Sequence, residues 1–240
     1  MKIVEYFLSI QGEGKFSGQN AFFIRTFGCN LNCTGFGVEK ISPKTGEKLV
    51  GCDTLRAVRD DFECEEIKFD EIKKQILDLK FKPIIVITGG EPLLHYKNSE
   101  FCEFVKFCLN NDFIVQFETN GTINLDFSKF DFYKKCVFAL GIKFSNSGES
   151  VEKRINKDAI KNIFANAKAF YKFVISKEDE ISQIKQILDI ANGEVWCMPL
   201  GKNKSQLEIN ANLVANLCIK NGFNYSDRLQ IRLWDDKEGV

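Results

Sequence analysis

The sequence predicts an α/β protein, specifically a partial (β/α)6 barrel with about six strand–helix units. The run KPIIVIT at residues 82–88 is continuously apolar, as in a strand buried on both faces of a parallel sheet. From residue 70 onward, segments with helical periodicity alternate with short apolar strands. Glycine-containing polar motifs follow several of these strands, at the end where parallel α/β folds place ligands.

The N-terminal part begins with two strands. Residues 2–10 alternate as in a strand, and the motif QGEG at 11–14 then breaks the pattern with two glycines, where the backbone can approach a ligand closely. Residues 20–27 form the second predicted strand, which ends in Gly28-Cys29. Residues 34–51 contain several glycines, a Ser-Pro pair and alternating charges, which predicts an inserted loop or hairpin.

The remaining chain is predicted as repeated strand–helix units. A helix of about eleven residues follows Asp70, its expected N-cap. A capping-box pattern, Ser205 and Glu208, marks the start of the last helix. Units of this length favour a parallel sheet with right-handed crossovers. The predicted strands are residues 82–88, 113–118, 136–142, 170–175, 194–198 and 229–234, and the predicted helices that follow the first are 99–111, 158–167, 180–191 and 205–220.

Charge and hydropathy exclude several classes of protein. Lys plus Arg equals Asp plus Glu at 33 each, so the chain lacks the positive field that non-specific nucleic-acid binding needs. No uncharged apolar stretch reaches eighteen residues, and the N-terminus lacks the apolar core of a signal peptide. We therefore expect a cytoplasmic protein with no membrane or nucleic-acid partner, folded as a single domain over residues 1–240.

Nine cysteines in a cytoplasmic protein are not expected to form disulfides, because that compartment keeps thiols reduced and the count is odd. Five of them lie within predicted strands or helices, where we expect small buried apolar side chains. These are Cys102, Cys108, Cys136, Cys197 and Cys218. Cys29, Cys33 and Cys52 are candidates for an iron–sulfur cluster or for zinc. With Cys64 as a fourth ligand they would make a structural zinc site, although the spacing lacks paired C-x2-C motifs.

Three motifs follow successive strands: the cysteine loop after 20–27, GGEP after 82–88, and ETNG after 113–118. Together and in this order they resemble the radical S-adenosylmethionine (SAM) superfamily. The match is closer still to its 7-carboxy-7-deazaguanine synthase family, through QGEG, Arg25, GCNL at 28–31 and CDT at 52–54. That resemblance implies a carbon–nitrogen lyase of queuosine and 7-deazaguanine biosynthesis, which uses a [4Fe-4S] cluster, SAM and Mg²⁺.

The resemblance also implies roles for single residues. Cys29, Cys33 and Cys52 would hold the cluster, with residues 34–51 as an insertion between the last two, and Thr54 would bind Mg²⁺. Expected SAM-binding residues are Gly90, Glu118, Lys143, Met198, Pro199, Leu200 and Gly201; of the family's Ser-Pro-Lys motif, only Lys143 is present in Gly141-Ile142-Lys143. Expected substrate-binding residues are Ile10, Gln11, Gly12, Arg25, Thr88 and Val240.

The implied substrate is 6-carboxy-5,6,7,8-tetrahydropterin, from which a radical derived from SAM abstracts hydrogen before the ring contracts and ammonia leaves. No side chain is expected to act as an acid or base, and His95 is interpreted as a packing or capping residue. An electron donor such as flavodoxin or ferredoxin and a homodimer are further implications of the resemblance. The alternatives are a radical SAM activase that acts on a partner protein and the structural zinc protein.

Overall fold

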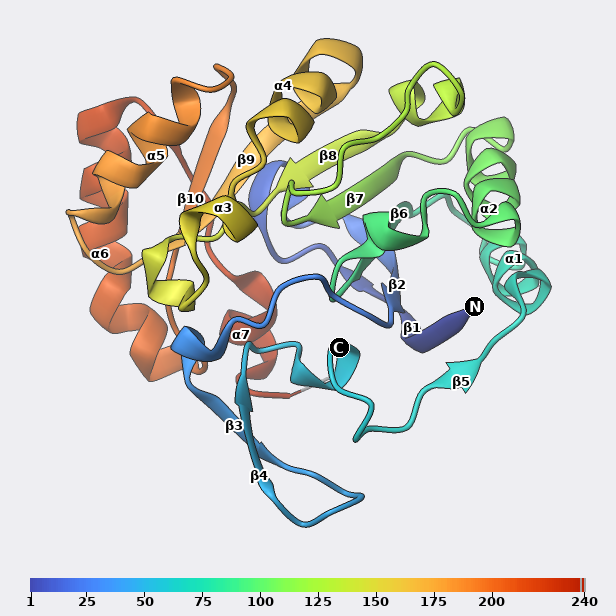
Figure 1. The fold of residues 1–240 in the computed structure, drawn as a ribbon, viewed down its shortest axis with the longest axis horizontal. Coiled ribbons are helices and arrows are strands. Elements are labelled where there is room, and N and C mark those ends of the chain that lie inside the picture. The colour runs from blue at the N-terminus through green and yellow to red at the C-terminus, as the bar shows by residue number, and fades with distance from the viewer. Residues whose placement is uncertain (238, 240) are drawn as a thin grey trace.

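A curved sheet of nine strands organises the computed structural model, which describes residues 1–237 and 239 (Figure 1). The strand order is β11-β10-β9-β8-β7-β6-β2-β1-β5, and all neighbours from β2 to β11 are parallel. β1 pairs antiparallel with both β2 and β5. The strands are β1 (Lys2–Ile10), β2 (Asn20–Thr26), β5 (Glu65–Glu66), β6 (Ile84–Gly89), β7 (Val115–Thr119), β8 (Val137–Leu140), β9 (Lys168–Ile175), β10 (Val195–Pro199) and β11 (Asn224–Tyr225). This mostly parallel sheet confirms the predicted fold class.

Helices cover the outer face of the sheet (Figure 1). They are α1 (Phe69–Leu77), α2 (Ser99–Asn110), α4 (Lys157–Asn166), α5 (Glu180–Leu188) and α6 (Lys204–Asn221). Two short helices, α3 (Val151–Arg154) and α7 (Leu229–Trp234), lie outside this layer. The main core lies between sheet and helices and includes Ile24, Ile87, Phe117, Phe138 and Phe173, all buried. The five cysteines expected to be buried are buried.

Residues that alternate with this core point to the opposite, inner face of the sheet. The apolar part of the inner face is small: Ala21, Ile84 and Val86 form a second cluster, with Phe16 and Phe23 packed against it. Further toward the carboxyl ends of the same strands the inner positions are polar. Arg25 and Thr88 are neighbours across β2 and β6, so the sequence period of two places charged groups inside the barrel.

The turn between β1 and β2 closes the barrel. It contains the short 3-10 helix η1 (Gly14–Phe16), in which the Lys15 ammonium lies 2.6 Å from the Glu194 carboxylate at the start of β10. The ring of Phe16 packs edge-on against Phe170 of β9, with centroids 6.4 Å apart. Because β1 and β10 lie near opposite ends of the strand order, these contacts require the sheet to curl on itself.

The predicted insertion forms a separate two-stranded hairpin, β3 (Val38–Ile41) and β4 (Lys48–Gly51), which projects from the body of the protein (Figure 1). The hydroxyl of Ser42 accepts from the backbone N–H of Thr45 and donates to Asp61, which fixes the turn of the hairpin and ties it to the following loop. The base of the hairpin and the start of α6 line a shared hollow. The hairpin therefore extends the cysteine loop without joining the main sheet.

Residues 229–234, predicted as a strand, are instead the helix α7. The sequence LQIRLW alternates apolar and polar residues, which predicted a strand. Six residues are less than two helical turns, too few for a helical period to be recognised in the sequence. Within this helix Gln230 donates to Glu13 and Arg232 donates to Asp227. These bonds, one to the turn after β1 and one to the residues just before the helix, favour the helix over an added edge strand.

Two predicted helix caps were also wrong. Lys68 is the N-cap of α1, without a side-chain hydrogen bond, and Asp70 lies inside the first turn, where it accepts from Lys73 at 2.9 Å. Asn203 caps α6 by accepting from the backbone N–H of Gln206 at 3.0 Å. The helix therefore begins one residue before Ser205. In both cases a neighbouring polar residue with the right backbone geometry took the capping position.

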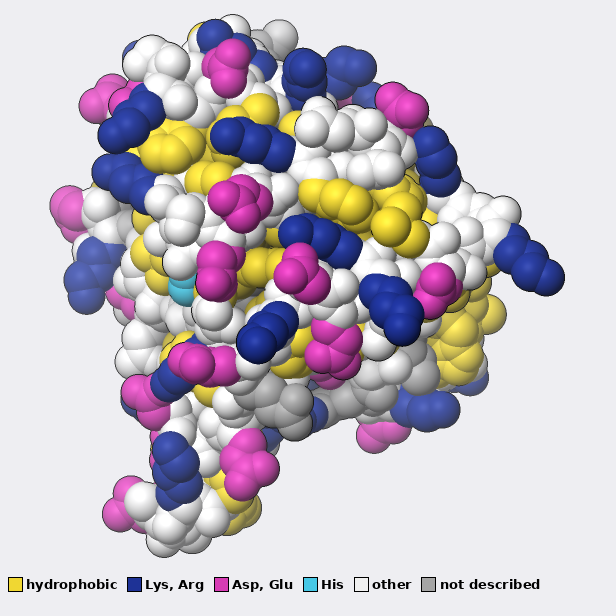
Figure 2. Space-filling view, turned by 90° about the vertical axis from the view of Figure 1, so that its right-hand side faces the viewer, with side chains coloured by type: hydrophobic (Ala, Val, Ile, Leu, Met, Phe, Trp, Pro, Cys, Tyr) yellow, Lys and Arg dark blue, Asp and Glu magenta, His cyan; other side chains and the backbone are white. Residues whose placement is uncertain are grey.

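The surface carries mixed charge. Figure 2 shows Lys and Arg intermingled with Asp and Glu over one face of the molecule, without a broad patch of one sign. Among the described residues, no helix combines the length and apolar composition that crossing a membrane requires.

Candidate functional site

Three thiols gather beside the carboxyl end of β2. Cys29 follows β2, Cys33 lies four residues later, and Cys52 follows β4, so the hairpin returns the chain to the first two cysteines. Burial raises the pKa of the Cys29 thiol to about 11 and that of Cys33 to about 12. The charge of Cys52 contributes to both shifts. The sulfur atoms are therefore close enough to interact electrostatically.

The thiols do not converge on one point. Among the described residues, no three Cys, His, Asp or Glu side chains converge as the ligands of a single metal ion. A four-iron cluster is larger than one ion, and its thiolate ligands stand correspondingly farther apart. The arrangement is thus open, and the four-thiol zinc site of Cys29, Cys33, Cys52 and Cys64 is not assembled in the described chain.

The cysteine loop packs directly on the GGEP motif. The backbone N–H of Glu91 donates to the carbonyl of Gly28 at 2.8 Å. A Cβ atom at Gly90 would overlap the same carbonyl and lie 2.8 Å from Cβ of Cys29. Any side chain at position 90 would push the first cysteine away. The glycine requirement at position 90 therefore follows from loop packing, a reason the sequence alone did not reveal.

Glu91 ties this motif to the end of β7. Its carboxylate is fully buried and accepts from Thr119 Oγ1 at 2.8 Å, from the Asn120 backbone N–H at 2.6 Å and from the Leu93 backbone N–H at 3.0 Å. Burial raises the pKa of Glu91 to about 7 in spite of these donors. A single side chain thus fixes the ends of β6 and β7 relative to each other.

A ring of polar side chains holds the cysteine loop just after Cys29. Asn30 accepts from Asn120 Nδ2 at 3.0 Å and donates to Thr122 Oγ1 at 2.8 Å. Thr122 in turn donates to Asn120 Oδ1 at 2.6 Å. Because Asn120 belongs to the ETNG motif and Thr122 follows it directly, all three predicted motifs meet at one place. The order of the motifs along the sequence is therefore matched by direct contact in the structure.

Thr54 lies beside the third thiol. Its hydroxyl is 3.3 Å from Cys52 Sγ, and its neighbour Asp53 is 3.8 Å from the guanidinium of Arg228. The segment from 52 to 54 therefore faces both the thiol group and the inner face of the barrel. A hydroxyl here is available to a cation that favours oxygen ligands.

A polar row crosses the inner face at the level where the strands end. Arg25 donates from Nε to the Glu5 carboxylate at 2.7 Å, a contact that orients the guanidinium. Thr88 donates to Glu118 Oε2 at 3.2 Å. Gln11 donates to Glu118 Oε1 at 3.2 Å. Two predicted substrate residues, Gln11 and Thr88, are therefore in direct contact with Glu118, a predicted SAM-binding residue.

Lys172 and Arg228 neutralise the carboxylates of this row. Lys172 lies 2.9 Å from Glu118 and 3.0 Å from Glu13, and Arg228 lies 2.8 Å from Glu13. Burial alone would raise the pKa of Glu13, but the two positive charges hold it well below its usual range. Burial alone would lower the pKa of Lys172, but Glu118 and Glu13 raise it above its usual value. Glu13, Lys172 and Arg228 are therefore charged at neutral pH.

The predicted SAM segments follow β8 and β10, which are separated in the sheet only by β9. Lys143 is close enough to Cys29 and Cys33 for its charge to lower the pKa of both thiols. Arg154, itself buried, donates to the Lys143 carbonyl at 2.8 Å and so holds this segment. After β10, the carbonyl of Gly201 accepts from Arg228 at 2.8 Å. Met198 and Pro199 are buried at the end of β10, whereas Leu200 is exposed.

Not every predicted residue lies in this group. Ile10 pairs with Asn20 at the other end of β2, away from the thiols. A Cβ at Gly12 would overlap the side chain of Gln230, so α7 covers this glycine. Val240 lies outside the described residues. Sequence reasoning missed Glu5, Glu13, Lys172, Arg228 and Gln230. A signal for Lys172 was present, because it is a charged residue at an inner position of the otherwise apolar segment AFYKFVI.

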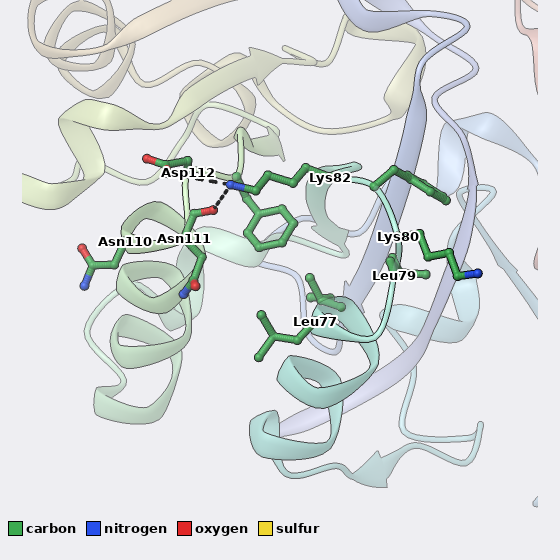
Figure 3. Close-up of a pocket in the computed structure, with 10 residues that line it drawn as sticks. Leu77, Leu79, Lys80, Lys82, Asn110, Asn111 and Asp112 are labelled. Carbon is green, nitrogen blue, oxygen red and sulfur yellow. Dashed lines mark hydrogen bonds and ion pairs between the residues drawn. The ribbon is translucent and has the colours of Figure 1, made fainter.

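A second hollow lies far from this site. It is bordered by the ends of α1 and α2 and by the residues that lead into β6 and β7, at the amino ends of the parallel strands (Figure 3). There the Lys82 ammonium donates to the Asn111 carbonyl at 2.9 Å. None of the residues selected from the sequence lines it, so the site at the carboxyl ends remains the candidate.

Comparison with known proteins agrees with this site. Residues 23–181 match the model of the radical SAM superfamily. The 7-carboxy-7-deazaguanine synthase of Clostridium acetobutylicum is 33% identical over 79% of this chain and 73% of its own length. The synthase of Aquifex aeolicus is 31% identical over 85% of this chain and 80% of its own length. That of Halobacterium salinarum is 25% identical over 98% and 91%.

Solved structures show the same fold. The crystal structure of QueE from Escherichia coli has a TM-score of 0.67 and 19% identity, and the match covers 94% of this chain and 92% of that one. Streptococcus suis SuiB bound to its precursor peptide SuiA has a TM-score of 0.51 and 12% identity, over 85% of this chain and 47% of that one. At these identities the two likenesses concern architecture only.

We predict that Lys172→Met destabilises the protein by about 3–5 kcal/mol, because it leaves Glu13 and Glu118 buried with less neutralising charge. Urea unfolding at neutral pH measures the effect. The control is Lys15→Met, which removes a partly exposed ion pair with Glu194 and should cost no more than about 1 kcal/mol.

The effect should also depend on pH. The folded-state pKa of Glu13 is depressed, so its contribution is present above the unfolded value of about 4.3 and is lost as pH falls through the folded value. The difference between wild type and Lys172→Met should be full at neutral pH and shrink below about pH 4. A difference that stays constant down to strongly acid pH would contradict the ion-pair explanation.

Proposed function

The chain belongs to the radical SAM superfamily and, within it, to the 7-carboxy-7-deazaguanine synthase family, and we propose that it converts 6-carboxy-5,6,7,8-tetrahydropterin to 7-carboxy-7-deazaguanine with loss of ammonia. It is an enzyme of the lyase class that acts in 7-deazaguanine biosynthesis. The observation that carries the proposal is the direct contact among the cysteine loop, the GGEP motif and the ETNG segment, beside a charged inner face.

The thiol group fits a cluster with three protein ligands. We propose Cys29, Cys33 and Cys52 as those ligands, because the charge of Cys52 acts on both other thiols and Lys143 favours the ionised forms of Cys29 and Cys33. Three thiolates leave one iron of a [4Fe-4S] cluster open. When bound, cluster and SAM supply the one-electron chemistry that generates a hydrogen-abstracting radical. The protein's own contribution is to hold these ligands, exclude side reactions and position the substrate.

Candidate SAM contacts surround the thiols. Lys143, held by Arg154, follows β8, and residues 198–201 lie at the end of β10, two strands farther along the sheet. Gly90 touches the loop that carries Cys29. Glu118 has one donor, Thr88, on Oε2, so this oxygen retains a lone pair for a ribose hydroxyl. These positions support the assignment of both segments and of Glu118 to SAM.

Arg25 is suited to hold the carboxylate of the pterin. The contact with Glu5 uses Nε and leaves the two terminal nitrogens of the fork for bidentate binding. Thr88 is its direct neighbour in β6, and Gln11 shares Glu118 with Thr88. We propose that Ile10, Gln11 and Gly12 form the opposite wall, with Val240 as a further substrate contact by family resemblance.

Mg²⁺ enters the proposal through Thr54, which lies beside Cys52 and next to Asp53. Mg²⁺ prefers oxygen ligands and often shares its coordination sphere with substrate. We further propose one domain over residues 1–240, a cytoplasmic location, a homodimer, and an electron donor of the flavodoxin or ferredoxin class. These last points rest on the family resemblance.

The alternatives receive less support. A radical SAM activase acts on a protein and would not need Arg25 and Thr88 on the inner face. There they stand beside the charged side chains of Glu118 and Lys172, so that four strands contribute to one polar surface. A structural zinc site would not account for the packing of the GGEP motif against Gly28. Both remain outcomes of the experiment that follows.

The decisive experiment is anaerobic reconstitution with iron and sulfide, followed by incubation with SAM, a reductant, Mg²⁺ and carboxytetrahydropterin. We expect 7-carboxy-7-deazaguanine to form only when SAM and reductant are both present. Zinc without iron or sulfide in the purified protein would support the structural zinc protein. SAM cleavage without any pterin product would support the activase.

We predict that Cys52→Ala abolishes cluster assembly, because the two remaining thiolates, Cys29 and Cys33, are too few to hold the cluster. Iron and sulfide per chain after reconstitution measure this. The matched control is Cys64→Ala, a cysteine of similar half-buried exposure that should keep the wild-type iron content. A Cys52→Ala protein with a full cluster would refute the ligand assignment.

We predict that Thr54→Ala retains the cluster and SAM cleavage but loses most turnover and most of its response to Mg²⁺, because an oxygen ligand is removed. Product formation is measured over a Mg²⁺ titration. Thr45→Ala, in the exposed hairpin turn, is the control. An unchanged Mg²⁺ response in Thr54→Ala would remove this residue from the metal site.

A further inference from the structure

The inner face of the sheet carries polar atoms that have no partner. Six buried side-chain atoms of the described residues lack a hydrogen bond, and three of them, in Ser9, Gln116 and Trp196, belong to residues of the inner face. Ser9 is paired with Ala21, and Trp196 with Lys172, both inner positions. Buried polar atoms are rarely left unsatisfied in proteins. Their concentration on this face indicates a surface completed by a polar ligand.

Gln116 is the most buried of the three at 1% exposure. It lies two residues before Glu118 on β7, so both side chains point to the inner face. Its amide nitrogen faces Glu118 Oε1 at 3.5 Å. Because a carboxylate only accepts hydrogen bonds, the amide must direct its NH2 group toward Glu118 and its carbonyl oxygen away from it. That oxygen is the atom without a partner.

We infer that Gln116 is a specificity-determining residue whose carbonyl oxygen accepts a hydrogen bond from the amino-pyrimidine edge of the substrate. This inference rests on the proposed function and identifies how the pterin is oriented. The 2-amino-4-oxopyrimidine ring presents N–H donors at one edge, and it is retained in the deazaguanine product. A residue that reads this edge does not interfere with chemistry on the other ring.

The position of Gln116 agrees with this orientation. It pairs with Val86, whereas Thr88 and Arg25 lie one inner position closer to the carboxyl ends of the strands. The amide is therefore deeper in the barrel than Arg25 and farther from the thiols. A pterin that directs its carboxylate to Arg25 and its pyrimidine edge to Gln116 turns the reacting ring toward the cofactor side.

Gln116 also shares its neighbour with the other substrate candidates. Gln11, Thr88 and Gln116 all donate to Glu118. Below it, the cluster of Ala21, Ile84 and Val86 is apolar and offers no donor side chain. The hydrogen-bond donor to the unpaired carbonyl oxygen of Gln116 must therefore come from the ligand or from a buried water. These two cases differ in what substitution of Gln116 does to recognition.

The test compares two ligands on the reconstituted protein with SAM and without reductant. Anaerobic equilibrium dialysis gives the dissociation constants of carboxytetrahydropterin and of its analogue with hydrogen in place of the 2-amino group. We expect wild type to bind the substrate about tenfold more tightly, or better, as is typical for one buried hydrogen bond. Gln116→Met should lose this preference and bind both ligands equally.

The control variant is Gln75→Met, which makes the same change on the exposed side of α1 and should keep the wild-type preference. If Gln116 had a purely structural role, Gln116→Met would weaken the binding of both ligands alike and leave the ratio of their dissociation constants unchanged. That result would overturn the inference. The same holds if wild type itself binds both ligands equally while forming product, a result that needs no variant. Absence of pterin turnover in wild type would instead count against the proposed function.

Discussion

The Glu118 carboxylate is the interaction on which the inner face depends. It receives Gln11 from the turn after β1, Thr88 from β6, Gln116 from its own strand and Lys172 from β9. Lys172 also donates to Glu13. Glu13 in turn accepts from Arg228 and Gln230 at the start of α7. Burial of so many charges is tolerated because each is paired. One ionic network thereby joins the first and last segments of the chain.

A second constraint acts on the cysteine loop. The loop is fixed at its beginning by Gly90 and Glu91, through the carbonyl of Gly28, and along its length by the ring of Asn30, Asn120 and Thr122. Between these attachments the insertion can vary, since β3 and β4 form their own small sheet. This explains how a hairpin of this size fits between the second and third cysteines without separating them.

The parts of the fold that sequence predicted best are those with strong periodicity. KPIIVIT became the central strand β6, and the helices after residues 99, 158 and 180 formed near their expected bounds. The errors arose where several local solutions have similar energies. Asn203 rather than Ser205 caps α6, and residues 229–234 form α7, in which Gln230 finds its partner, Glu13, more than two hundred residues away. Such partners are invisible to a pattern of six residues.

The sequence by itself determined the fold class, the family and the identity of the motifs, because alternation of apolar residues and the order of the cysteine loop, GGEP and ETNG are properties of the chain. Only the tertiary structure decided how these motifs touch, why position 90 requires glycine, and that Lys172, Arg228 and Gln116 belong to the inner face. Gln116 and Lys172 come from separate strands, and Arg228 is the residue that precedes α7. Their proximity depends on the curl of the sheet, which brings β9 and β10 to the turn that follows β1.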